Sequence, residues 1–349
     1  MTPSTDSSKQ VAVLLNANAR LVTDKVKRSL ERIVPRANLF LSHTKEEALD
    51  YVKHIIDNRY ATIFSGGGDG SFVHLLNLAR DYLKKRTRPG ETEPELPQFG
   101  ILKLGTGNGI SSFVGSRGGT KLLERSLHAD HLDTIEMSLI ERNDRIFHFA
   151  GSGFDARLLK DYYDFMDTLK TPAARKNFSG LVGYFWSGLG KTVPESIIKP
   201  DRGAVRVEIE PGGQSFYVKH THGRDQAVAT ESTLLYSGPS TAVAVATEPF
   251  YGYNVRAFPF ATMKPGFMNL RVLLAQPVSL VANMRDYWNG SYRGRGVKDF
   301  LVRKVKVTYE KPTPLQVGGD YDSLADSITY SIFPQKCRLV DFRHLAHLA

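Results

Sequence analysis

The sequence predicts a chain of two parts, an α/β domain with a parallel sheet followed by a domain of antiparallel β-strands. Two observations support this fold class. Apolar runs alternate with helical periodicity over the first third of the chain, whereas short strands separated by turns follow one another after about residue 133. With 349 residues, the chain is long enough for two domains that each have a core.

The first third shows the alternation that is typical of a parallel sheet covered by helices. Short continuous apolar runs indicate buried strands, and apolar residues at every third or fourth position indicate helices. The expected strands are 11–15, 37–41, 61–65 and 99–104, and the expected helices are 23–34, 44–57 and 71–83. Ligands of such sheets bind at the carboxyl ends of the strands, so the loops that follow these strands are the candidate site.

The rest of the chain reads as a sandwich-like β domain. The expected strands are 134–140, 145–151, 204–210, 214–220, 241–247, 268–274, 304–310 and 327–333. A helical insertion over 158–189 interrupts them.

The composition limits which classes of binding partner and which cellular compartment we expect for the protein. The net charge of +10 favours anionic partners, namely nucleic acid, anionic lipid or polyphosphates. The sequence contains no zinc-ligand spacing, RNP motif or zipper, which disfavours nucleic acid. The single cysteine, Cys337, rules out an internal disulfide and favours a reducing compartment. Because no signal peptide or membrane-spanning run is recognisable, we expect a cytoplasmic protein.

The segment SGGGDGS, residues 65–71, follows the third expected strand. Its glycines allow backbone N–H groups to face phosphate oxygens, and the helix that follows adds its positive end. Neither the Walker loop nor the dinucleotide fingerprint has this spacing. Three roles are open for Asp69: a ligand of Mg²⁺, an acceptor of the proton of an attacking hydroxyl, or a helix N-cap. The first two are roles in phosphoryl transfer.

A second glycine loop, GTGNG over 105–109, follows the next strand, and the two loops can face each other across a crevice. Together these loops resemble the diacylglycerol kinase catalytic domain family, which includes bacterial diacylglycerol kinases, sphingosine kinases and ceramide kinases. NAD kinases and phosphofructokinases share the GGDG loop, but LGTGN (104–108) points to the lipid kinases. Further segments resemble the family in the same order: VLLN (13–16), GSGFDA (151–156), FPFA (258–261), GFMNL (266–270) and PLQVGGD (314–320).

The resemblance implies an ATP-binding α/β domain over 1–133, joined by the C-terminal segment 335–349, and a β-sandwich lipid-acceptor domain over 134–334. The active site would lie in the cleft between them. It implies an ATP- and Mg²⁺-dependent lipid kinase, with diacylglycerol as the first acceptor and ceramide or another sphingolipid as the second. The partner would be a lipid at an anionic membrane surface, with peripheral association, and a homodimer stays open.

The resemblance also assigns roles to individual residues. Asp69 would be the catalytic base, and Asp320 would be a second catalytic carboxylate and a metal ligand. Asp155 would bind the acceptor or make an interdomain hydrogen bond. For Thr44, a nucleotide contact and a capping box with Glu47 are equally supported. The nucleotide-binding residues would be Asn16, Thr44, Ser65, Gly66, Gly67, Gly68, Gly70, Gly105, Thr106, Gly107, Asn108 and Arg157.

Four positions depart from the family pattern. Ala17 stands where the family has proline, and Gly318 stands where it has a carboxylate. Pro265 replaces an aspartate of the structural magnesium site of some bacterial relatives. Arg157 replaces the acceptor-binding aspartate of sphingosine kinases, which counts against a free sphingoid amine as substrate. Two other hypotheses therefore stay open: a non-catalytic nucleotide- or lipid-binding regulator, and an NAD-kinase-like enzyme with a soluble substrate.

Overall fold

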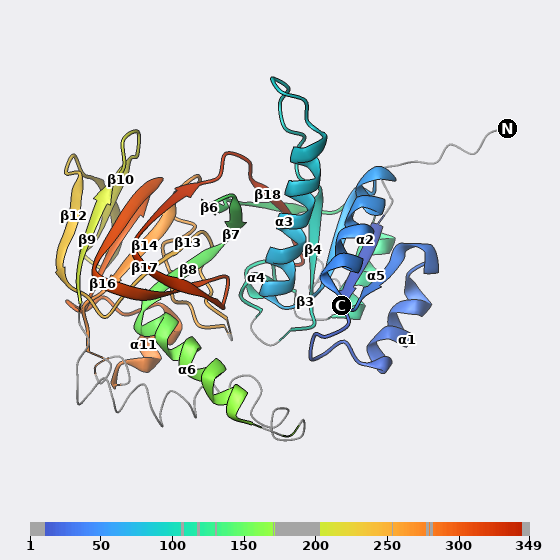
Figure 1. Ribbon diagram of the computed structural model, residues 1–349, viewed down its shortest axis with the longest axis horizontal. Helices are drawn as coiled ribbons and strands as arrows, with labels where there is room; N and C mark the ends of the chain where they lie inside the picture. Colours follow the sequence, from blue (N-terminus) through green and yellow to red (C-terminus); the bar gives the residue numbers. More distant parts are fainter. Residues whose placement is uncertain are drawn as a thin grey trace. The chain divides into compact units, whose positions relative to one another are not determined.

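The computed structural model describes residues 11–105, 108–116, 119–129, 131–169, 171, 203–252, 254–276, 279 and 282–343. The chain forms two compact units, one of residues 1–139 with 334–349 and one of residues 140–333 (Figure 1). Each unit has its own sheet.

The first unit is built on a six-stranded sheet with the order β2-β1-β3-β4-β18-β5. Its first five strands run parallel to their neighbours, and only β5 runs antiparallel, to β18. The strands are β1 (Val11–Asn16), β2 (Leu39–Ser42), β3 (Thr62–Gly67), β4 (Gln98–Lys103), β5 (Thr134–Met137) and β18 (Cys337–Val340). The predicted α/β domain with a mostly parallel sheet is thus confirmed.

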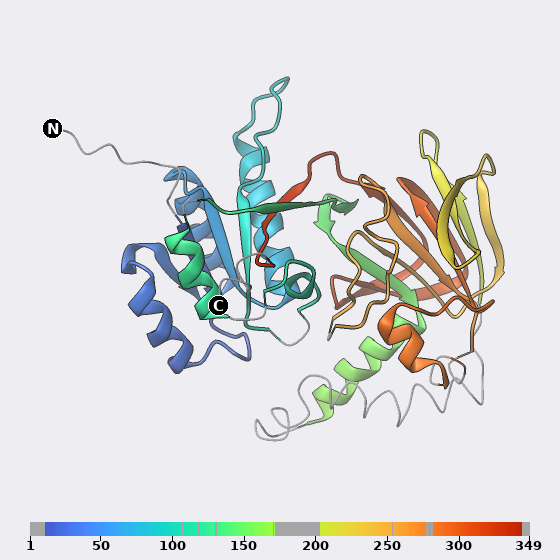
Figure 2. The same cartoon turned by 180° about the vertical axis from the view of Figure 1, so that it is seen from behind.

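Helices cover both faces of this sheet. Helices α2 and α3 lie against one face, and α1 and α5 lie against the other (Figures 1 and 2). The helices are α1 (Asp24–Ile33), α2 (Lys45–Asp57), α3 (Asp69–Arg86), α4 (Gly109–Phe113) and α5 (Thr120–His128), with a short 3₁₀ turn, η2 (Arg36–Asn38). Aromatic rings fill the core: Phe72 meets Phe99 edge to face at 5.5 Å, and Phe64 meets Phe342 at 6.2 Å.

The expected strand 134–140 belongs to the first sheet, not to the β domain. Its first part is β5, which pairs with β18, and Ile140 opens the first strand of the second unit. The sequence could not reveal this pairing, because β5 and β18 lie about two hundred residues apart in the chain. Alternating side chains at a sheet edge look alike whichever sheet they join.

The second unit contains one antiparallel sheet of twelve strands. Its strands are β6 (Ile140–Arg142), β7 (Arg145–Phe147), β8 (Phe149–Gly153), β9 (Ala204–Ile209), β10 (Ser215–Thr221), β11 (Arg224–Ala229), β12 (Leu234–Pro239), β13 (Ala242–Ala246), β14 (Met268–Leu273), β15 (Val297–Val302), β16 (Lys304–Val317) and β17 (Asp320–Ile332). The long strand β16 pairs with β9 through its first half and with β8 through its second half, so the sheet branches there. The predicted antiparallel β domain is confirmed.

Among the described residues, two helices accompany this sheet, α6 (Phe154–Thr168) and α11 (Met284–Asn289). The first accounts for the start of the expected insertion 158–189; residues 172–189 lie outside the described residues. Within the described part of the chain, no helix is both long and apolar enough to cross a bilayer.

Candidate functional site

The carboxyl ends of β1, β3 and β4 lie side by side and place most of the predicted nucleotide-binding residues at one edge of the sheet. Leu15 pairs with Gly66, and Gly66 pairs with Leu102, so the loops after the three strands are neighbours. This edge carries Asn16, the first glycine loop and the second glycine loop. Thr106 and Gly107 of the second loop lie outside the described residues.

The two glycine loops pack directly on each other. A Cβ atom on Gly105 would lie 2.1 Å from the Cα atom of Gly68, which is too close for any side chain. Likewise, a Cβ atom on Gly67 would lie 2.5 Å from the side chain of Ser71, and one on Gly66 would overlap Leu15. Gly105 is therefore required by the close approach of the two loops, whereas Gly66 and Gly67 are crowded by the side chains of Leu15 and Ser71.

Asp69 connects the two glycine loops. Its carboxylate accepts hydrogen bonds from the backbone N–H of Gly109 at 2.5 Å and of Ile110 at 3.2 Å. Only 8% of the residue is exposed. The N-cap role is wrong for α3, because Gly68 is the N-cap of that helix and Asp69 is its first residue. The side chain instead binds the amides at the start of α4, forty residues further along the chain.

Burial changes the acid–base behaviour of Asp69. Desolvation raises the pKa of its carboxyl to about 6, while the hydrogen bonds from Gly109 and Ile110 act in the opposite direction. Near neutral pH the group is therefore mostly ionised, and its pKa lies close enough to the working pH to take up a proton. A carboxylate tuned in this way suits general-base catalysis.

Asn108 shapes the second loop so that its amides reach Asp69. Its backbone is left-handed, with φ at +57°, a conformation that asparagine tolerates better than most residues. Its side-chain amide donates to the carbonyl of Gly105, and its own carbonyl accepts from the hydroxyls of Ser111 and Ser112. The position of Asn108 in the sequence motif is thus explained by the turn that it makes.

Asn16 bridges the first loop to the start of α3. Its Nδ2 donates to Ser71 Oγ at 2.9 Å, and its Oδ1 accepts from the backbone N–H of Asn18 at 3.0 Å. The N–H of Ala17 donates to the carbonyl of Ser42, a hydrogen bond that the family's proline could not make. The sequence analysis did not identify Ser71 as a partner of Asn16. The only feature of the sequence that could have indicated it is that Ser71 directly follows the first glycine loop.

The other predicted residues of this edge lie within regular elements. Ser65 is buried in β3, and Gly70 lies in the first turn of α3, where amide N–H groups point out of the helix start. This 18-residue helix directs its positive end toward the loops. The edge thus combines N–H groups at a helix start with one buried carboxylate.

Thr44 forms the expected capping box. Its Oγ1 accepts from the N–H of Glu47 at 3.1 Å, and the Glu47 carboxylate accepts from the N–H of His43 at 2.7 Å. We expect Thr44→Ala to lower the free energy of unfolding by about 1 kcal/mol, because one amide of α2 loses its partner. Thermal unfolding measures this, with Thr44→Ser as the matched control that keeps the hydroxyl. Unchanged stability with a raised KM for ATP would contradict the capping role and favour a nucleotide contact.

Asp320 lies in the second unit, directly after a tight hairpin. Gly318 and Gly319 connect β16 and β17 with φ values of +61° and +91°, as a two-residue type I′ turn requires. This geometry explains the departure at Gly318. Asp320 itself is exposed, and its carboxylate accepts from the Tyr163 hydroxyl at 2.9 Å.

The described residues offer no preformed metal cage. No group of three acidic, His or Cys side chains close enough to hold an ion occurs among them. At the departure around Pro265, the neighbouring Lys264 places its ammonium 4.5 Å from the centre of the Phe216 ring. Pro265 itself has no side-chain oxygen with which to bind a metal ion. Mg²⁺ commonly binds through substrate phosphates and one or two carboxylates, which a nucleotide and a lone aspartate satisfy.

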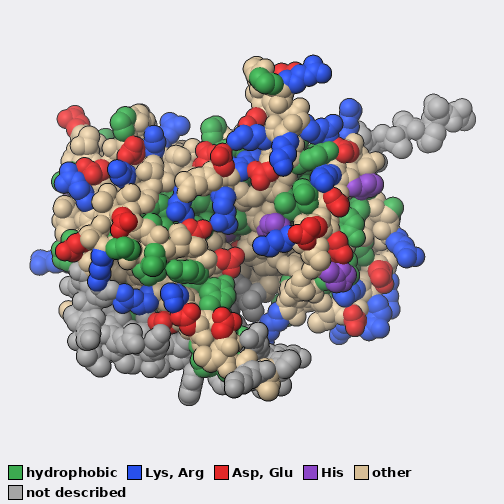
Figure 3. Space-filling model, viewed as in Figure 1, with side chains coloured by type: hydrophobic (Ala, Val, Ile, Leu, Met, Phe, Trp, Pro, Cys, Tyr) green, Lys and Arg blue, Asp and Glu red, His purple; other side chains and the backbone are tan. Residues whose placement is uncertain are grey.

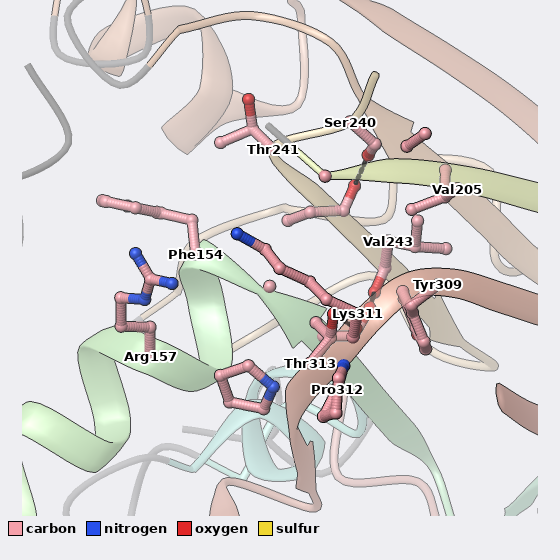
Figure 4. A pocket seen from close by; sticks show the side chains of 16 residues that line it. Phe154, Arg157, Val205, Ser240, Thr241, Val243, Tyr309, Lys311, Pro312 and Thr313 are labelled. Carbon is pink, nitrogen blue, oxygen red and sulfur yellow. Dashed lines mark hydrogen bonds between the residues drawn. The ribbon is translucent and has the colours of Figure 1, made fainter. Parts of the chain in front are cut away.

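Arg157 lines a pocket inside the second unit, at the start of α6 (Figure 4). Asp155 belongs to the same helix, and its side chain lies outside the described residues. Gly153, which precedes the helix, has φ at +81°, and a Cβ atom there would lie 2.6 Å from the carbonyl oxygen of Thr241. The glycine of the GSGFDA segment thus lets the helix start close to β13.

Comparisons with known proteins find similarity to lipid kinases. The family model of the diacylglycerol kinase catalytic domain matches residues 10–140. Over these residues the chain is similar to the catalytic domain of this lipid kinase family. The matched residues contain both glycine loops and Asp69.

Similarity to curated proteins extends beyond these residues. Lipid kinase YegS of Escherichia coli strain K12 is 23% identical over 249 residues, which cover 69% of this chain and 67% of the relative. A crystal structure of a diacylglycerol kinase from Bacillus anthracis str. Sterne aligns with a TM-score of 0.58 at 14% identity and covers 96% of this chain and 98% of that one. Another structure from that organism gives a TM-score of 0.62 at 14% identity, with the same coverage of both chains. At this identity the structures support the two-part fold alone.

Proposed function

We propose that this protein is a kinase that transfers the γ-phosphoryl group of ATP to the hydroxyl of a neutral lipid, with diacylglycerol as the first candidate and ceramide as the second. The observation that carries the proposal is the buried Asp69 carboxylate, which is held by Gly109 and Ile110 and has a pKa of about 6. An attacking lipid hydroxyl has to lose its proton, and such a carboxylate can accept it.

The glycine loops would hold the phosphates of ATP. Backbone N–H groups of residues 66–70 and the positive end of α3 favour an anion beside Asp69. Mg²⁺ would enter with the nucleotide and neutralise charge that develops on the phosphates, while Asp69 orients or deprotonates the acceptor. Asp320 is the second proposed carboxylate; its tyrosine partner, Tyr163, has its pKa raised mainly by burial and stays a hydrogen-bond donor.

We place the proposed reaction at an anionic membrane surface. Three cations, Lys84, Lys85 and Arg86, occupy the last turn of α3, and Lys and Arg side chains gather around that end of the helix (Figure 3). Each cation close to an anionic bilayer contributes about 1 kcal/mol to attraction. The protein would then visit the membrane peripherally.

The test is transfer of labelled γ-phosphate from ATP to a panel of acceptors in mixed micelles. We expect label on diacylglycerol, with ceramide as the next acceptor, and no transfer when EDTA removes divalent cations. Sphingosine, phosphatidylglycerol and NAD complete the panel. Label on NAD alone would replace the proposal with a soluble-substrate kinase, and ATP binding without labelled product would replace it with a regulator.

A further inference from the structure

The pocket in the second unit combines positive charge with small and apolar side chains (Figure 4). It has a volume of about 220 Å³ and sixteen lining residues, which come from the β8–α6 junction, the segment around the start of β9, the start of β13 and the middle of β16. Two of them, Arg157 and Lys311, are cations, and no described lining residue is acidic. Such a lining attracts an anion.

Lys311 reaches the pocket because β16 is interrupted there. The pairing of β16 with β17 shifts register between Thr308 and Thr313, and Lys311 lies within this interruption. Irregularities of this kind turn a side chain away from its regular direction in the strand. The Lys311 ammonium and the Arg157 guanidinium both lie on the side of the pocket where Phe154 is (Figure 4).

Two further features favour an anion in the pocket. Helix α6 is 15 residues long, begins at Phe154, and has no side-chain cap on its N-terminal N–H groups. Its positive end therefore adds to the charge of Arg157 and Lys311. Tyr309, another lining residue, has a buried hydroxyl beside the hydroxyl of Ser152, so the lining also holds groups that can donate hydrogen bonds.

The size of the pocket limits the ligand. Sites for drug-sized molecules usually measure roughly 300–1,000 Å³, so 220 Å³ is too small for a whole nucleotide or lipid. A phosphate group with a few attached carbon atoms fits. We propose that this pocket binds the phosphate of an anionic phospholipid headgroup, with Arg157 and Lys311 as its cationic ligands. The choice of a lipid as the source of the phosphate rests on the proposed function; the binding of phosphate does not.

The experiment measures vesicle binding by the full chain without nucleotide, so it does not depend on turnover. The vesicles contain phosphatidylcholine with or without phosphatidylglycerol. We expect tighter binding to the anionic vesicles, a loss of about tenfold in affinity for Lys311→Gln, and retention in Lys311→Arg. Lys304→Gln is the matched control, because Lys304 lies on the same strand outside the pocket. If Lys304→Gln loses as much vesicle affinity as Lys311→Gln, the effect comes from general surface charge and the proposed phosphate site is wrong.

Soluble ligands distinguish the source of the phosphate. Inorganic phosphate and glycerol phosphate should displace the wild-type protein from anionic vesicles and have at least about tenfold less effect on Lys311→Gln. If Lys311→Gln instead weakens ATP binding and leaves vesicle binding intact, the phosphate belongs to the nucleotide and the proposal is wrong. If the wild type and Lys311→Gln each bind neutral and anionic vesicles equally well, the pocket does not recognise phosphate and the proposal is wrong; an acyl chain would then be its candidate ligand. An absence of kinase activity would leave each of these binding results unchanged.

Discussion

Asp69→Asn should lower the rate of phosphoryl transfer about a thousandfold while ATP binding persists. The substitution keeps the size of the side chain but removes the group that accepts the proton of the attacking hydroxyl. The asparagine oxygen can accept from Gly109 or Ile110, although not from both with the present geometry, since its NH₂ group would face one of the two donors. The measurement is kcat with the best acceptor, alongside the Kd for ATP.

A matched control distinguishes the loss of the catalytic base from the loss of any carboxylate on the protein. Asp50→Asn on α2 removes an exposed carboxylate that contacts only the neighbouring Lys53 in the described structure, and it should leave kcat unchanged. If Asp69→Asn retains transfer within about tenfold of wild type, Asp69 is not the base. Its role would then be limited to holding α4 against α3.

The pH profile gives a second test of Asp69. The carboxylate works as a base only when ionised, so the rate should fall as pH drops below about 6, the pKa that burial gives it. The free energy of unfolding depends on pH in the opposite sense. Because the folded-state pKa lies above the 3.8 of an ordinary aspartate, the contribution of Asp69 to stability is complete below about pH 4 and is lost as pH rises through 6. Asp69→Asn should remove this dependence of the unfolding free energy on pH.

Gly105→Ala should destabilise the first unit by about 3 kcal/mol and abolish nucleotide binding. The added Cβ atom would lie 2.1 Å from the Cα and 2.4 Å from the backbone nitrogen of Gly68, so backbone has to move. A shift of Gly68 displaces the first turn of α3 and with it the N–H groups proposed to hold the phosphates. The measurements are the midpoint of thermal unfolding and the Kd for ATP.

Gly90→Ala serves as the control for this substitution. Its φ of +90° also disfavours a side chain, but no atom lies within 4 Å of the added Cβ. It should cost about 1 kcal/mol through backbone strain and leave ATP binding intact. If Gly105→Ala behaves like Gly90→Ala, the contact between the two glycine loops has no bearing on the site.

The sequence alone determined the fold class and the order of the main elements. Periodicity distinguishes a buried parallel strand from an amphipathic helix, and both signals are local, as in the run VAVLL and the capped helix that begins after Thr44. The two glycine loops were also evident, since few functions require so many glycines directly after two strands. Their resemblance to a known family indicated lipid kinase chemistry.

Only the tertiary structure decided which partners these residues meet. Asp69 was expected to hold Mg²⁺, to accept a proton or to cap its own helix, and only the structure reveals that it binds the amides of Gly109 and Ile110, about forty residues further along the chain. In the same way, β5 joins a strand from the end of the chain, and the pair Gly318–Gly319 forms a tight hairpin where a family carboxylate was expected. These contacts join residues that are far apart in the sequence, so local propensity does not reveal them. Loop closure and strand register bring the residues together, and packing selects the register.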